Sequence, residues 1–447
     1  EGKTQPNWLQ STSYLTMWFG ITMLQNSFSF ASLRLAMILI SAVSAPLMYM
    51  ILRELNAKKS IAILSSFVLV TNPFISSYLR QFVTEPISLP LYLLAILLIV
   101  KGIKTGRNMF FIAASLVSIF GFLNKQIDII PAMAAFLFLF LHDNRYFPIK
   151  PLQNIALKHF GLGKYMTLKN SLRKLLLIGI SVLFALAFFS YNLITTGHIL
   201  SPTTVPSTVS PDAPYATQFG IKPSHNAFRI IQDAIFIGFM FLPFGIYLRN
   251  PNRKYIIVAS AAIGLLAALS GKAFVFHSNI ILVFFTSTLF AYTGINLALY
   301  IFRNRRRSPV MNFSFIALVG CVLFTIFKIN IFLMKYYIVF LPFVLMFLAL
   351  KVKDTLPYIL TIILLGGFGV FITINDIQVH GRIWDGVNSL LISGVSPNEI
   401  QGYPTVVGWL TDMVDNIYAD YKIKMDKHRI FNDLVDLDSI QVVKIEN

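Results

Sequence analysis

The sequence predicts an all-α polytopic membrane protein with about 12 membrane-spanning or membrane-embedded helices and a small outer C-terminal segment. Of its 447 residues, 56% are hydrophobic and only 13% are charged, and the mean hydropathy is +0.70. Apolar runs of about twenty residues recur along the chain. A soluble domain cannot hide such a composition, because its large surface must be covered mainly by polar residues. A lipid bilayer is therefore the expected solvent.

The charge and the cysteine content narrow the class further. A net charge of +18 would suggest a nucleic-acid partner in a soluble protein, but a polytopic membrane protein collects basic residues in its cytoplasmic loops. We therefore expect no nucleic-acid partner. The single cysteine, Cys321, lies within an apolar run, which leaves no intrachain disulfide and no cysteine metal site.

The apolar runs define the expected helices, with boundaries that carry a tolerance of a few residues. In chain order they cover residues 31–52, 60–77, 86–101, 108–123, 127–142, 174–195, 228–248, 255–271, 277–302, 311–332, 336–350 and 356–374.

The loops between these runs alternate in charge. Every second loop, beginning with the one after the first run, is basic, and together these loops hold 22 of the 37 Lys and Arg residues. The positive-inside rule places them in the cytoplasm, and we expect a multi-pass protein of the plasma membrane. The outer face then carries residues 1–30, 80–85, 124–128, 196–226, 271–277, 328–337 and the tail after 376.

This topology predicts two parts of very different size. Residues 1–375 form the multi-span domain, and residues 376–447 form an extracytoplasmic segment that is polar and mixed in charge. The segment is too short to bury much of a core of its own. We interpret it as a small cap on the outer face.

Arg80 and Glu85 lie at the mouth of one apolar run. Charges beside a membrane span are costly, so each needs a reason. The structural reason is an interfacial salt bridge at a helix start, with Pro86 in the first turn and the acid at the positive end of the helix dipole. The functional reason is that both residues line the rim of an active site.

Further charges share the predicted outer face and favour the functional interpretation. Lysines at the mouths of separate helices can converge on one anionic group, and an ammonium group suits phosphate. For any one lysine, snorkelling to the interface is the structural alternative, and for a tyrosine it is a place in the aromatic belt. The candidates beyond Arg80 and Glu85 are Lys125, Asp128, Lys272, His277, Lys328, Lys335 and Tyr336.

Other catalytic machinery is not visible in the sequence. There is no GxxxxGK[ST] loop, no HExxH motif and no cluster of His and carboxylates at metal-ligand spacing. We therefore assign no metal-binding residue.

Several stretches are similar to those of a known family. Four stretches carry the likeness. They are the span that starts with "TEP" at residues 84–86, "SFASLRLAMILIS" with Arg34 as its arginine, "YNLITTGHILSPT" where a span enters an outer loop, and "MKYYIVFLPFVLMF" with Lys335 in place of an arginine. The chain resembles integral-membrane GT-C glycosyltransferases over about residues 5–420. Prokaryotic relatives of protein O-mannosyltransferases and lipid A aminoarabinose transferases are the nearest group.

The resemblance implies a reaction. Such enzymes transfer a hexose or pentose from a polyprenyl-phosphate carrier to a glycan, lipid or protein acceptor on the extracytoplasmic face of the membrane. On this reading Arg80, Lys125, Lys272, Lys335 and Tyr336 bind the phosphate or sugar of the donor, and Glu85 is a catalytic carboxylate, with Asp128 and His277 in support. Some relatives use a divalent metal ion, although no ligand set for one is visible here.

One part of the family pattern is not found in the chain. The first span and the acidic catalytic loop of the family should precede "TQPNWLQSTSYL", and Glu1 is the only acid before that stretch. We therefore expect that the chain lacks its natural beginning and that the main catalytic base lies upstream of Glu1.

Two other functions remain open at this point. A transporter or flippase of a lipid-linked glycan would also have many spans and cationic residues, but it is expected to carry charges near the bilayer midplane and an internal repeat. Here the charges gather at one face and the two halves of the chain look dissimilar. A non-catalytic GT-C relative is the third possibility.

Overall fold

The computed structural model describes most of the helical part of the chain. The described residues are 30–73, 85–142, 171–196, 223–248, 250–269, 280–305, 307–327 and 338–370, with short pieces at 15–16, 18–19, 22, 374, 389, 392–394, 400–401, 421–425 and 440–444.

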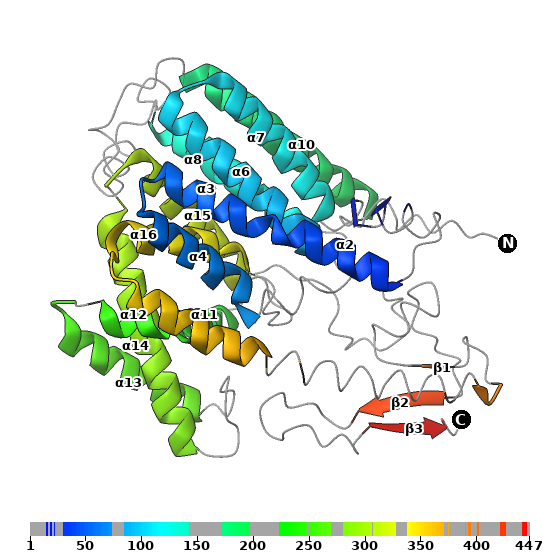
Figure 1. The fold of residues 1–447 in the computed structure, drawn as a ribbon, viewed down its shortest axis with the longest axis vertical. Coiled ribbons are helices and arrows are strands. Elements are labelled where there is room, and N and C mark those ends of the chain that lie inside the picture. The colour runs from blue at the N-terminus through cyan, green and yellow to red at the C-terminus, as the bar shows by residue number, and fades with distance from the viewer. Residues whose placement is uncertain are drawn as a thin grey trace.

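Helices occupy the described part of every predicted span (Figure 1). The first group consists of α2 (Phe30–Ala42), α3 (Ser44–Glu54), α4 (Lys59–Thr71), α6 (Glu85–Thr105), α7 (Asn108–Asn124), the short 3-10 helix η2 (Gln126–Ile129), α8 (Ile130–His142) and α10 (Ser171–Thr196). The second group consists of α11 (Pro223–Met240), α12 (Leu242–Tyr247), α13 (Arg253–Leu269), α14 (Ile280–Asn304), α15 (Pro309–Phe327), α16 (Leu341–Lys351) and a helix over Leu356–Val370.

Five of these helical stretches are long and apolar enough to cross a membrane. At 1.5 Å per residue, about 20 residues span the hydrocarbon core of a bilayer. The predicted all-α polytopic class is therefore confirmed. The five stretches are Leu35–Glu54, Glu85–Thr105, Leu172–Tyr191, Ile280–Asn304 and Pro309–Ile326.

Two predicted spans are each interrupted by a turn. The first breaks at Val43 between α2 and α3, and the seventh breaks at Phe241 between α11 and α12. In both cases a proline follows closely, Pro46 and Pro243. Proline cannot donate to the carbonyl four residues earlier and its ring clashes with that carbonyl, so the helix is interrupted in the preceding turn.

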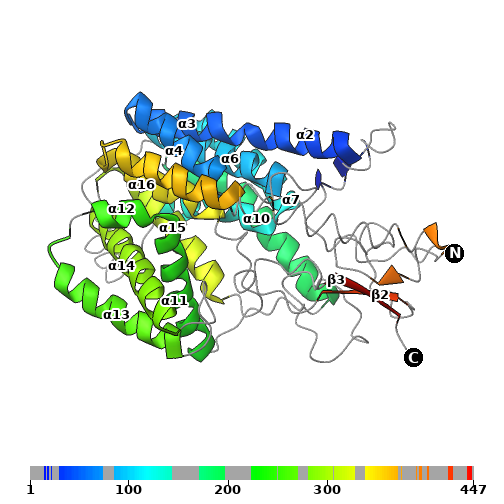
Figure 2. The same cartoon turned by 60° about the horizontal axis from the view of Figure 1, so that its bottom comes forward.

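α6 is the central helix of the first group. It packs against α2, α3, α7 and α8, which surround it in Figure 1. Glu85, most of the apolar residues and both prolines of α6 are buried, as expected for a helix enclosed by other helices. Within the second group, α11 to α14 form a layer of their own, which joins the first group mainly through α15 and α16 (Figure 2).

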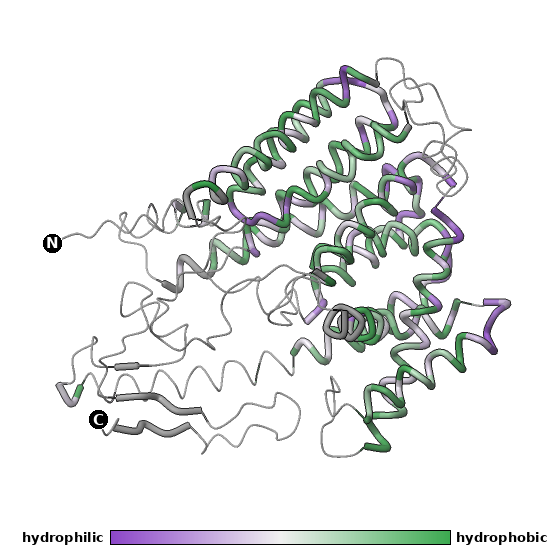
Figure 3. Tube along the Cα trace, turned by 180° about the vertical axis from the view of Figure 1, so that it is seen from behind, coloured by the Kyte–Doolittle hydropathy of each residue, from purple (hydrophilic) through white to green (hydrophobic). Residues whose placement is uncertain are grey.

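The outward faces of the helices are apolar. Leu39 on α2, Leu183 on α10 and Ile281 on α14 are exposed, and hydrophobic residues dominate along the described helices while hydrophilic ones gather near their ends (Figure 3). A soluble protein rarely exposes so much contiguous apolar surface. These faces are expected to contact lipid.

The C-terminal segment contains strands that the sequence did not predict. β1 (Ile400–Gln401) pairs in parallel with β2 (Tyr421–Met425), and β2 pairs antiparallel with β3 (Ile440–Lys444). β2 and β3 are "YKIKM" and "IQVVK", rich in the residue types that favour strands. The strands lie to one side of the helices in Figures 1 and 2. The division of the chain at residue 375 stays a prediction.

Candidate functional site

A buried ion pair lies where α6 begins, and we call this part of the bundle the Glu85 end. α6 starts at Glu85 with Pro86 in its first turn, as the sequence predicts. Lys125 donates from Nζ to Oε1 of Glu85 at 2.8 Å. The Glu85 side chain is 2% exposed and that of Lys125 is 13% exposed, so the pair is largely shielded from solvent and interacts strongly.

One face of α6 lines a pocket beside this ion pair. Residues at positions i, i+3, i+4 and i+7 of a helix fall on a single stripe, and four residues of α6 with this spacing point into the pocket. A volume of about 230 Å³ includes open solvent at the mouth, and the enclosed space has room for about one water molecule. The lining residues are Glu85, Ser88, Leu89 and Tyr92 of α6 together with Lys125, Asp128, Ile338 and Val339.

The turn after α7 places Lys125 and Asp128 in the pocket. The Lys125 backbone is extended, with φ −156° and ψ 119°, and its N–H donates to the carbonyl of Gly121 at 2.7 Å. The chain then enters η2, where the Asp128 N–H donates to the Lys125 carbonyl at 2.9 Å. The two residues are neighbours through a 3-10 turn rather than a continuous helix. Their side chains reach different partners on α6.

Asp128 is a second buried carboxyl group, 1% exposed. The Ser88 hydroxyl donates to its Oδ2 at 2.5 Å. Within the described part of the chain, its other oxygen, Oδ1, has no hydrogen-bond partner.

Tyr92 closes the deep side of the pocket. Its hydroxyl donates to the carbonyl of Val339 at 3.2 Å and lies 3.7 Å from the sulfur of Cys321 on α15. Its ring packs edge-on against Phe343 of α16. Three segments that are far apart in the sequence therefore meet behind the pocket, and the apolar rings make that side rigid and dry.

A residue near the start of the chain also reaches the Glu85 end. Both the backbone N–H and the hydroxyl of Thr16 donate to Oδ1 of Asn124, at 3.1 and 2.7 Å. Asn124 is fully buried and directly precedes Lys125. The segments around residues 16, 85, 124 and 338, which the loop charges assign to one membrane face, are thus gathered at one end of the bundle.

The structure brings together three of the predicted site residues, namely Glu85, Lys125 and Asp128. A contact between Arg80 and Glu85 stays a prediction, because Arg80 is not among the described residues. The other predicted site residues that lie outside the described part of the chain are Lys272, His277, Lys335 and Tyr336, together with Lys328 and the side chain of Arg34.

Sequence reasoning missed three polar residues that the structure places in the protein interior. Ser88 and Tyr92 share the pocket face of α6 with Glu85, and their helical spacing from Glu85 was the available signal. Asp233, in the apolar α11, is 4% exposed and accepts a hydrogen bond from Thr325 of α15 at 2.8 Å. An acid within an apolar span is itself a signal for an internal partner.

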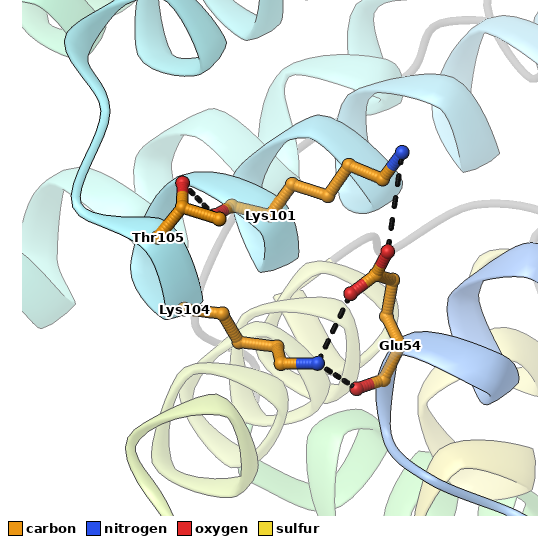
Figure 4. A network of polar contacts seen from close by, with 4 residues as sticks. All are labelled: Glu54, Lys101, Lys104 and Thr105. Carbon is orange, nitrogen blue, oxygen red and sulfur yellow. Dashed lines mark hydrogen bonds and ion pairs between the residues drawn. The ribbon is translucent and has the colours of Figure 1, made fainter.

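The opposite end of α6 carries a different ion-pair cluster, and we call it the Glu54 end (Figure 4). The Glu54 carboxylate at the end of α3 lies 3.0 Å from Lys104 Nζ and 3.9 Å from Lys101 Nζ. Lys104 also donates to the Glu54 backbone carbonyl. These side chains are 29–36% exposed, and the cluster ties the end of α3 to the last turns of α6.

No metal site is apparent in the part of the chain that the structure describes. Groups of three or more His, Cys, Asp or Glu side chains that could hold an ion are absent from those residues. Use of a divalent ion stays a prediction.

Most of the pocket residues lie in a region that is similar to a known protein family. Residues 12–157 match the model of the dolichyl-phosphate-mannose-protein mannosyltransferase family. This region contains every pocket residue except Ile338 and Val339. No individual curated protein matches the chain. The similarity to this family supports, at a general level, a membrane-bound glycosyltransferase with a polyprenyl-phosphate-linked sugar as donor.

Proposed function

We propose that this protein is an integral-membrane glycosyltransferase that moves a hexose or pentose from a polyprenyl-phosphate donor to an acceptor at the extracytoplasmic face. The observation that carries the proposal is the buried Glu85–Lys125 ion pair, which lines a pocket inside the family-matched region. Ionisable groups buried in a membrane protein are costly and mark substrate sites more often than structural ones. The Glu85 end is therefore the proposed donor site.

The chemistry requires a cation at this site. The bond between the anomeric carbon and the phosphate oxygen breaks, and its electron pair stays on the lipid phosphate. The acceptor hydroxyl oxygen forms the new bond to the anomeric carbon, and its proton goes to a carboxylate. Lys125 stabilises the charge that develops on the phosphate. An ammonium group has three donors, so it can contact Glu85 and a phosphate oxygen at once.

Glu85 then acts as a positioning residue for Lys125. Its carboxylate holds the lysine charged and fixed in a site where solvent is largely excluded. Arg80, Lys272 and Lys335, with Tyr336 and His277, form the second part of the proposed donor site, because the loop topology brings their segments to the same face. The acceptor is a hydroxyl of a protein, a lipid or a glycan, and the location is the plasma membrane.

Sugar transfer by the full-length gene product in proteoliposomes tests the proposal. A radiolabelled polyprenyl-phosphate sugar is supplied with peptide, lipid and glycan acceptors, and label is expected in one acceptor class. Lys125→Gln should lower the transfer rate by about 100-fold or more, as expected when a charge-stabilising group is lost. The matched control, Lys104→Gln at the Glu54 end, should keep the wild-type rate.

Two results would contradict the proposal. Movement of intact labelled lipid between leaflets without transfer would identify a transporter or flippase. A folded protein that neither binds nor consumes any labelled donor would be a non-catalytic relative.

A further inference from the structure

The Oδ1 atom of Asp128 is the most informative polar atom in the pocket that the proposed chemistry does not use. It is buried and lacks a hydrogen-bond partner among the described residues, while its side chain lines the pocket. A buried polar atom without a partner costs about 1–3 kcal/mol. An atom of this kind takes its partner from a bound molecule, either a water molecule or a hydroxyl group of a ligand.

Three neighbours hold the Asp128 carboxyl group in one orientation. Ser88 occupies Oδ2 at 2.5 Å, so Oδ1 is the carboxyl oxygen that lacks a partner among the described residues. The backbone N–H of Asp128 is fixed on the Lys125 carbonyl. On the other side, a Cβ at Gly121 would lie 3.0 Å from the Asp128 Cβ, so the glycine makes room for the side chain. Such support is what a binding group needs for a defined geometry.

The position of Asp128 beside Lys125 limits which part of the donor it can meet. Sugar and phosphate are joined through a single oxygen, so a group next to the phosphate-binding lysine is also next to the sugar. In an in-line displacement the acceptor approaches from the side opposite the leaving phosphate, and its base must lie there too. Asp128 lies three residues from Lys125 in the same pocket, on the leaving-group side, where the hydroxyls of the sugar are within reach.

We propose that Oδ1 of Asp128 forms a hydrogen bond with a hydroxyl group of the donor sugar, and that this contact lets the pocket distinguish a sugar-loaded polyprenyl phosphate from the bare lipid phosphate. The inference rests on the proposed function and adds a specificity-determining residue to it. A hydroxyl group both donates and accepts hydrogen bonds, so it suits the carboxyl group in either protonation state.

Binding measurements on the full chain in lipid nanodiscs test the inference. Two probes are compared, a polyprenyl-phosphate sugar and the same polyprenyl phosphate without sugar. Asp128→Ala should weaken binding of the sugar-bearing lipid about tenfold, the effect of one buried hydrogen bond, and leave binding of the bare lipid unchanged. Asp128→Asn should retain most of the affinity, because an amide still donates and accepts. Lys104→Gln is the matched control at the Glu54 end.

Donor analogues that each lack one hydroxyl provide a second measurement, which needs only the wild-type protein and Asp128→Asn. A site built to hydrogen-bond a hydroxyl rejects the analogue without it. One analogue should bind the wild type about tenfold more weakly than the full donor, and this difference should largely persist in Asp128→Asn, because its amide can still bond to the hydroxyl.

The outcomes separate the two proposals. If the wild type binds neither lipid, both the proposed function and the inference fail. If Asp128→Ala weakens both lipids equally, or neither, the inference is overturned while the proposed function stands. Equal binding of all hydroxyl-deleted analogues by the wild type would also overturn it.

Discussion

The two ends of α6 each carry a glutamate–lysine ion pair, but in opposite surroundings. At the Glu85 end, the side chains of Glu85 and Lys125 are 2% and 13% exposed. At the Glu54 end, the side chains of Glu54 and Lys104 are 30% and 36% exposed, and Glu54 contacts two lysines (Figure 4). About 30 Å of helix separates the two ends.

This difference indicates which cluster has a structural role and which has a functional one. An exposed ion pair contributes about 0–1 kcal/mol, because water screens it. A buried pair must overcome a desolvation cost of several kcal/mol per ion, and well-packed apolar residues are often as stable or more so. The Glu54 cluster has a sufficient structural role, because it holds the end of α3 against α6. The Glu85 pair has beside it a pocket and an Asp128 oxygen without a partner among the described residues, and it is better explained by binding.

The largest expected difference between the two ends is in the free energy of unfolding when one partner of each ion pair is removed. Lys125→Met leaves the Glu85 carboxylate buried without its lysine and should lower the free energy of unfolding by about 3–5 kcal/mol. Lys104→Met should lower it by about 1 kcal/mol or less. Denaturant unfolding of the detergent-solubilised variants measures both values. The double variant Glu85→Gln/Lys125→Met should recover stability but not sugar transfer. Recovery of transfer would make the pair purely structural.

Substitutions at two glycines should affect stability similarly but should affect binding of the donor lipid differently. Gly121→Ala places a methyl group 3.0 Å from the Asp128 Cβ, and Gly106→Ala introduces a side chain at φ +69° after α6. Each should cost about 1–2 kcal/mol, the first through overpacking and the second through left-handed backbone strain. Only Gly121→Ala should weaken binding of the sugar-bearing lipid. Equal losses of binding affinity in both variants would contradict the proposal that the donor lipid binds at the Glu85 end.

Salt should produce the smallest difference between the two ends. Glu54→Gln should lower the free energy of unfolding by about 0.5 kcal/mol in dilute buffer, and this loss should vanish at about 1 M salt, where the screening length is about 3 Å. The loss caused by Lys125→Met should persist at the same salt concentration, because its pair is shielded from ions. Parallel melting curves at low and high salt measure both. A salt-sensitive loss at Lys125 would mean that the Glu85 end is open to solvent.

The sequence alone determined the features that depend on local physics. Long apolar runs predicted the helices, because a segment in lipid must satisfy its backbone hydrogen bonds internally. Pro86 and Glu85 predicted the start of α6, and Pro46 and Pro243 carried the signal for the two interruptions that the span assignments missed.

Only the tertiary structure decided which side chains meet. Proximity in the sequence suggested Arg80 as the partner of Glu85, whereas the described partner is Lys125, 40 residues away. The contacts of Ser88 with Asp128, of Thr16 with Asn124 and of Tyr92 with Val339 likewise join separate segments. Helical periodicity shows which residues share a face, but the face that a neighbouring helix presents depends on how all the helices pack.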